Sequence, residues 1–143
     1  MKPIFFLLTV CSIFFSCKKD TLDISLFQQC HNSQSLDSTA ISNNLAGSWI
    51  WTKQSCFWTG KTTTADKNIK VIFNSNATFS VLENSSILTQ GNWGLKIIDS
   101  NMWGLDLTSP SEYLYGRILF CNNQILFNDS YRDGCDNLFT KSN

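Results

Sequence analysis

Apolar residues alternate with polar ones along most of the chain after residue 46, and this period of two constrains the fold more than any other feature. Trp49 and Trp51 fall on one face of an extended segment, and Val71 and Phe73 do so in another, because alternate side chains of a β-strand lie on the same face. Clusters of Asn, Ser, Gly and Asp interrupt the pattern about every 8 to 12 residues. The pattern is typical of an antiparallel meander of short strands.

Eight strands are expected, at residues 47–56, 68–74, 77–82, 90–98, 102–108, 112–121, 124–128 and 136–141. Most connections are short and contain Asn, Asp or Ser, which tolerate the left-handed backbone geometry of tight turns. Only residues 57–67 form a long loop. Eight antiparallel strands can close into a barrel whose interior holds side chains or one small ligand. We therefore predict an all-β fold, an eight-stranded antiparallel up-and-down meander barrel.

Residues 1–16 have the features of a lipoprotein signal peptide. Lys2 precedes an apolar run that ends at residue 15, and Ser16 comes directly before Cys17. This is the anatomy of a signal peptide, and the run is shorter than the roughly 17 to 25 residues of a membrane-spanning helix. The residues before Cys17 resemble a lipobox, although Phe14 stands where Leu is commonest. We expect cleavage before Cys17 and attachment of diacylglycerol, carrying palmitate, to its thiol; the alternative is an ordinary secretory signal.

Residues 17–44 are rich in Ser, Gln, Asn and Asp and show little periodicity. We expect a lipidated N-terminus and a polar tether there, which lift a single domain, residues 45–143, off the bilayer. The chain is 43% hydrophobic and 15% charged, a composition that supports a folded domain. Its eleven basic residues are matched by eleven acidic ones and are scattered, so nothing indicates nucleic-acid binding.

Four cysteines remain outside the leader when Cys17 is set aside, and an even number in a secreted chain indicates disulfides. If the first and last strands of the barrel are neighbours, Cys56 at the end of the first lies beside Cys135 at the start of the last. Cys30 in the tether then pairs with Cys121 by elimination. The wide spacing of the cysteines makes a metal site the weaker alternative.

The residue patterns of common enzyme sites are missing. His31, the single histidine, lies in the tether away from any cluster of acids or nucleophiles, and the chain has no phosphate-binding glycine loop and no CxxC motif. Asp129, Asp133 and Asp136 fall in one segment, and clustered carboxylates can bind calcium. Their spacing does not match an EF-hand, and turn formation explains them more simply. We expect no catalytic residue, no cofactor and no metal site.

Six aromatic residues are candidates for contact with a ligand. Inside a barrel their rings can line a cavity and stack on an apolar molecule; the alternative is that they fill the core. Trp58 stands in the long loop, where exposure would indicate contact with a partner and burial against the disulfide is the alternative. The candidates are Trp51, Trp58, Trp93, Trp103, Tyr113 and Tyr115.

The start of the predicted barrel contains a short Gly-x-Trp signature, Gly47 and Trp49. With its neighbouring segments it resembles the lipocalin-like domain of Bacteroidota lipoproteins over about residues 45–141. The resemblance implies a barrel with a habit of binding, in which Trp49 plugs the closed end and packs beneath a basic residue of the last strand, here Lys141. The segments that carry the resemblance are residues 45–49, 71–74, 77–79 and 133–135.

Two functions follow from these observations. The first is a noncatalytic, membrane-anchored protein that holds a small apolar ligand inside the barrel. The second is an interaction or inhibitor module that engages another envelope protein through the long loop and the tether. In either case we expect a monomer anchored through Cys17 in the bacterial cell envelope, at the outer membrane or the cell surface rather than the inner membrane.

Overall fold

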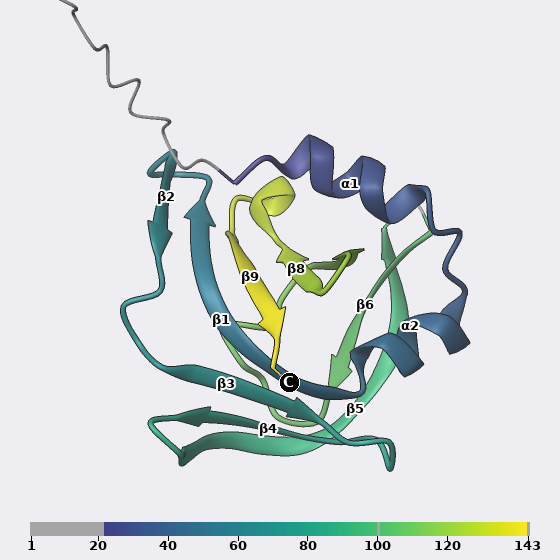
Figure 1. Cartoon of the computed structure of the whole chain (residues 1–143), viewed down its shortest axis with the longest axis vertical. Coiled ribbons are helices and arrows are strands. Elements are labelled where there is room, and N and C mark those ends of the chain that lie inside the picture. The colour runs from purple at the N-terminus through teal and green to yellow at the C-terminus, as the bar shows by residue number, and fades with distance from the viewer. Residues whose placement is uncertain (1–21, 100, 143) are drawn as a thin grey trace, which may run out of the picture.

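The computed structural model describes residues 22–99 and 101–142, so the predicted leader and Cys17 lie outside the described residues. Eight strands form a closed antiparallel barrel, in which the last strand pairs with the first (Figure 1). This confirms the predicted fold class. In chain order the strands are β1 (Gly47–Cys56), β2 (Lys61–Thr64), β3 (Ile69–Phe73), β4 (Thr78–Glu83), β5 (Ser86–Asp99), β6 (Met102–Leu107), β7 (Arg117–Cys121), β8 (Gln124–Asn128) and β9 (Cys135–Lys141). Strand β2 is not one of the eight barrel strands, because it pairs only with β1.

Three strands differ from the predicted ones by more than one residue. The loop expected at 57–67 contains β2, β5 begins at Ser86 instead of residue 90, and β7 begins at Arg117 instead of residue 112. The last difference lies at Gly116, whose φ of +95° is outside the range of a β-strand. Only glycine fits there, since a Cβ would lie 2.0 Å from the Asn128 carbonyl oxygen.

Two helices form in the segment where we expected an irregular tether. They are α1 (Ile24–Asn32) and α2 (Ser38–Leu45). The carboxylates of Asp23 and Asp37 cap their first turns by accepting hydrogen bonds from backbone N–H groups, which stabilises a helix start. From residue 22 onward, therefore, the described part of the segment expected to be a polar tether is folded against the barrel.

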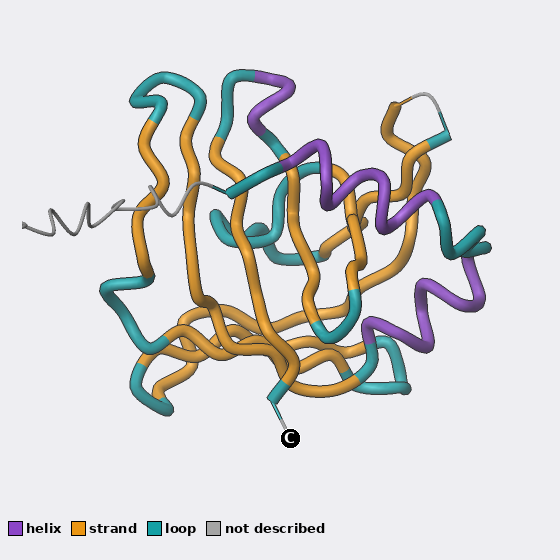
Figure 2. The backbone as a smooth tube through the Cα atoms, turned by 45° about the horizontal axis from the view of Figure 1, so that its top comes forward, coloured by secondary structure: helices purple, strands orange, loops and turns teal. Residues whose placement is uncertain are grey.

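Helix α1 lies across the outer face of the barrel (Figure 2). Phe27 on its inner side packs against Leu119 of β7, Leu126 of β8 and Leu138 of β9, and these four residues form a small buried cluster outside the barrel. Strand residues that point away from the barrel interior are thereby also withdrawn from water. The three strands are covered on both faces.

The barrel has one weak seam, between β6 and β7, where a single residue pair, Gly104 and Arg117, is in register. Phe120 of β7 instead finds its partners at the end of α1. Its N–H donates to Nδ1 of His31 at 3.1 Å, and its carbonyl oxygen accepts from Nε2 of Gln34 at 3.2 Å. Side chains thus replace a neighbouring strand and satisfy backbone groups that would otherwise be unpaired.

Both ends of the barrel are closed by other parts of the chain. Helix α2 places Ile41 and Leu45 in the interior cluster at one end, and Nε1 of Trp49 donates to the Leu45 carbonyl oxygen at 2.7 Å. At the other end, the loop between β6 and β7 buries Tyr113 and Leu114 in the same cluster. The core is therefore continuous from one end of the barrel to the other.

Candidate binding surface

Both predicted disulfides are present. Cys56, the last residue of β1, is bonded to Cys135, the first residue of β9, and the two are also paired in register. Cys30 of α1 is bonded to Cys121 at the end of β7. The first disulfide closes the barrel beside the turn into β2, and the second fixes α1 on the outside of the barrel.

The turn between β1 and β2 exposes two aromatic rings, which we call the aromatic tip and define as Phe57 and Trp58. Their exposed fractions are 56% and 77%, and their rings meet edge to face at 5.5 Å. The turn is ordered by backbone bonds: the Phe57 N–H donates to the Gly134 carbonyl oxygen at 3.2 Å, and the Gly60 N–H donates to that of Cys56 at 3.0 Å. The turn that carries the aromatic tip is thus held by hydrogen bonds, and its two apolar rings are exposed to water.

The first described residues of the chain lie beside this hairpin. The Leu22 N–H donates to Oγ1 of Thr62 in β2 at 3.3 Å, and that hydroxyl donates to Oγ of Ser55 in β1 at 3.3 Å. Leu26, one turn further on, is 61% exposed. Beneath α1 a groove of about 390 Å³ is lined by Leu22, by Leu26 of α1, by Lys53 of β1 and by residues of β7, β8 and β9.

The six aromatic candidates for ligand contact do not form one site, although Trp93 and Trp103 line the same hollow beside α2. Trp51, Trp93 and Tyr113 are buried and Trp103 is half-buried, whereas Trp58 and Tyr115 are exposed. The Trp51 ring packs edge to face on Tyr113 at 5.2 Å, and its Nε1 donates to Oδ1 of Asn137 at 3.1 Å. Burial raises the pKa of the Tyr113 hydroxyl to about 12. These contacts are those of core residues.

The middle of the barrel is filled by side chains. A cavity large enough to hold water would give the side chains that line it measurable accessible surface. Eight inward residues of β3, β4, β7, β8 and β9 have an exposed fraction of 0% or 1%, while Trp51 of β1, Trp93 of β5 and Leu105 of β6 have 6%, 9% and 8%. The eight residues are Val71, Phe73, Phe79, Val81, Ile118, Ile125, Phe127 and Phe139. Between the eight side chains there is therefore no ligand-sized space.

Lys141 of β9 lies over the ring of Trp49 of β1. Lys141 is opposite Trp49 in the register of β1 and β9, and its Nζ lies 5.2 Å from the centroid of the Trp49 ring. A cation over an aromatic face is attracted by the ring quadrupole. Gly47, with φ +127°, makes room for this contact, since a Cβ there would lie 3.3 Å from Cε of Lys141.

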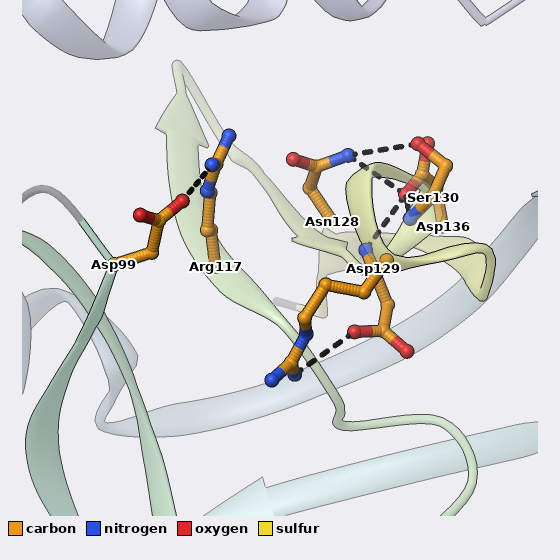
Figure 3. A network of polar contacts seen from close by, with 7 residues as sticks. Asp99, Arg117, Asn128, Asp129, Ser130 and Asp136 are labelled. Carbon is orange, nitrogen blue, oxygen red and sulfur yellow. Dashed lines mark hydrogen bonds and ion pairs between the residues drawn. The ribbon is translucent and has the colours of Figure 1, made fainter.

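The acidic segment around Asp136 forms hydrogen bonds within the protein (Figure 3). Asp136 is 1% exposed, and its Oδ1 accepts from Nδ2 of Asn128 and from the N–H groups of Asp129 and Ser130, each at 2.8 Å. Oδ1 of Asp129 accepts from Arg132 at 3.1 Å. Across residues 22–99 and 101–142, no three His, Cys, Asp or Glu side chains gather where they could hold a metal ion. The segment is a hydrogen-bonded turn.

His31 has a structural position. Its Nδ1 accepts the Phe120 N–H, and its ring stacks on the Phe120 ring with centroids 6.5 Å apart. Burial lowers the pKa of His31, because desolvation disfavours the charged form. The ring is therefore held neutral at a position where a proton on Nδ1 would break the hydrogen bond.

Sequence patterns identified Trp58 but missed its neighbours in the surface. The Phe57 ring is adjacent in sequence, and a pair of aromatics beside a cysteine in a turn was a usable signal. Leu22 and Leu26 carried no such signal, since their place beside the hairpin depends on the docking of α1.

Among the described helices none is long and apolar enough to cross a membrane.

In comparisons with protein-family models, with curated proteins and with solved structures, nothing matches this chain.

Proposed function

We propose that this protein is a lipid-anchored, noncatalytic, lipocalin-like module that binds an apolar partner through its outer surface and not through the barrel interior. One observation carries the proposal: the interior is occupied by its own side chains, whereas the two rings of the aromatic tip are in water. Exposed, preordered aromatic rings are favourable contact groups, because they bury a large area at a small cost in side-chain entropy. This favours binding through the outer surface, as in the predicted interaction module, over the predicted binding of a ligand inside the barrel.

The anchor is tested by the mass of the mature protein extracted from its membrane. We expect a chain that begins at Cys17 and carries acyl groups, with four cysteines that react with an alkylating reagent only after reduction. Cys17→Ser should be recovered without added lipid and away from the membrane. A wild-type mass without acyl groups would overturn the lipid anchor.

The binding surface is tested by photo-crosslinking in cells. A photoreactive aromatic amino acid replaces Trp58 in one variant and Ile97, an exposed residue of β5 with an exposed fraction of 59%, in the control. We expect adducts from position 58 that are absent from position 97. Equal yields at the two positions, or no adduct at 58, would contradict binding through the aromatic tip.

The rival function, a small ligand inside the barrel, is tested by native mass spectrometry of protein purified from its host. We expect the mass of the polypeptide and its lipid alone. A copurifying small molecule that is lost from a Trp51→Phe variant would overturn the proposal, because Trp51 points into the barrel and away from the outer surface.

A further inference from the structure

We propose that the apolar partner of the aromatic tip is the surface of the lipid bilayer itself, so that the barrel lies on the membrane with Phe57 and Trp58 among the headgroups. The inference rests on the proposed lipid anchor at Cys17. It deepens the proposed function by naming the partner, and it depends on three observations: the length of the chain before the fold, the place where that chain meets the fold, and the chemistry of the tip.

The chain between the anchor and the fold is short. Leu22 is the fifth residue after Cys17, and five residues span at most about 17 Å when fully extended. The residues after Leu22 cannot lengthen this connection, because α1 is held on the barrel by the Cys30–Cys121 disulfide and by Phe27. An acyl chain on Cys17 therefore brings the bilayer surface to within about 17 Å of Leu22.

The end of the barrel that this short connection draws to the membrane is the one that carries the aromatic tip. Leu22 is hydrogen-bonded to Thr62, and Thr62 pairs with Ser55 in the hairpin. The next pair, Cys56 with Lys61, is the last before the turn that holds the tip. Figure 1 shows the chain entering α1 beside β2 and the end of β1. Leu22, at which the described chain begins, and the tip are thus on the same side of the molecule.

The chemistry of the tip fits a membrane interface. Tryptophan is enriched at the level of the lipid headgroups, where its amphipathic ring is partly apolar and partly hydrated. Lys61, exposed at the start of β2, and Lys18 and Lys19 beside the anchor, can approach anionic headgroups. The diacylglycerol on Cys17 already holds the chain at the membrane, and a second contact of this kind fixes how the barrel lies on it.

A protein partner fits the tip less well. Stable protein interfaces bury roughly 1,200 to 2,000 Å² in total, whereas two aromatic rings on a narrow turn offer about 150 to 250 Å² each. A bilayer needs no complementary surface, and the anchor holds the tip at a high effective concentration next to it. The small area that is insufficient for a free protein partner is sufficient for an anchored contact.

The test uses the lipidated full chain reconstituted in vesicles of zwitterionic phospholipid with a minor anionic fraction, in which part of the acyl chains is brominated. Bromine quenches tryptophan fluorescence only within the bilayer. Trp49, Trp51 and Trp93 are buried inside the barrel and Trp103 is half-buried in β6, so the difference between the wild type and Trp58→Phe measures the quenching of Trp58. We expect quenching in the wild type and in Ile97→Ser, and its loss in Trp58→Phe, which keeps an aromatic ring but removes the fluorophore.

The outcomes separate the two proposals. If the protein carries acyl groups and cosediments with vesicles, but the wild type and Trp58→Phe are quenched equally, the membrane contact is overturned and the anchored module stands. The same holds if acrylamide reaches Trp58 equally well in vesicles and in the soluble Cys17→Ser chain. If the mature protein carries no acyl group, the anchor falls and this inference falls with it.

Discussion

At the scale of single residues, protonation of His31 would break a hydrogen bond at the seam between β6 and β7. Its Nδ1 accepts a hydrogen bond from Phe120, so the neutral ring carries its proton on Nε2. Protonation of Nδ1 would set two N–H groups against each other and leave the backbone N–H of β7 without an acceptor. No other strand residue takes its place there, since β6 pairs with β7 at Gly104 and Arg117 alone.

This arrangement predicts a loss of stability in mild acid. The pKa of His31 is lowered in the folded protein from its ordinary value of 6.5, so the unfolded chain binds a proton that the folded chain excludes. The stability contributed by neutral His31 is complete above pH 6.5 and is lost as the pH falls from 6.5 through the lowered folded pKa. We expect the Tm to fall between pH 7 and pH 5 more steeply in the wild type than in His31→Asn, which keeps an acceptor that does not titrate. Parallel Tm profiles of the two proteins would contradict the prediction.

Asp136 stabilises the turn before β9. Its carboxylate is the common acceptor of three buried or half-buried donors, and Asp136→Ala would leave them unsatisfied. We expect a loss of about 3 kcal/mol in the free energy of unfolding, measured in urea. The matched control is Asp106→Ala, which removes an exposed carboxylate paired with Lys96 and should cost about 0.5 kcal/mol or less. A loss as small in Asp136→Ala as in the control would show that water replaces the carboxylate.

At the scale of elements, the sequence predicted the strands better than the helices. Period two identified the barrel, because inward side chains such as Val71 and Phe73 alternate with half-exposed ones over whole strands. Helices α1 and α2 have nine and eight residues, a length at which isolated helices are marginal in water. Their stability comes from docking: Phe27 under α1 and Ile41 under α2 are buried only because the barrel is present. Composition could not reveal this.

The two disulfides could be predicted because their pairing depends on the closure of the barrel and not on the local structure around each cysteine. The pairing of Cys56 with Cys135 follows from barrel closure, and Cys30 was left with Cys121 whatever the local structure of the segment around it. The site was less predictable. Period two showed which rings point inward, such as Trp51, but the filling of the barrel also depends on Tyr113, which enters from a loop that we expected to be a strand.

The Cys30–Cys121 disulfide is expected to stabilise the seam locally. It closes a loop with a sequence separation of 91, and its removal in a Cys30→Ala, Cys121→Ala variant should cost about 2 to 4 kcal/mol. Hydrogen exchange should locate the effect. We expect the amide of Phe120, whose acceptor is on α1, to lose more protection than the amide of Val71 in β3. Equal losses at the two amides would mean that the bond stabilises the whole fold and not the docking of α1.

At the scale of the whole molecule, the protein has two separate cores and a filled barrel. The interior cluster includes α2 and the β6–β7 loop at the two ends, while the cluster under α1 lies outside the strands. Eight strands leave an interior that is only just wide enough for side chains, and the many rings of this chain occupy it. The interior is thus used for stability, which is why the proposed binding is at the outer surface.

Because side chains fill the barrel interior, we can predict how the protein responds to small apolar compounds. Phe127 is 1% exposed inside the barrel and packs edge to face on Phe139 at 5.7 Å, so Phe127→Ala should lose about 3 to 5 kcal/mol and leave a dry void. A ligand that binds only the folded state raises the Tm in proportion to its occupancy. We therefore expect saturating benzene or indole to raise the Tm of Phe127→Ala and to leave the wild type and the exposed-site control Ile97→Ala unchanged. If the Tm of the wild type rises as much as that of Phe127→Ala, the barrel interior admits ligands in solution, and binding inside the barrel would be supported instead.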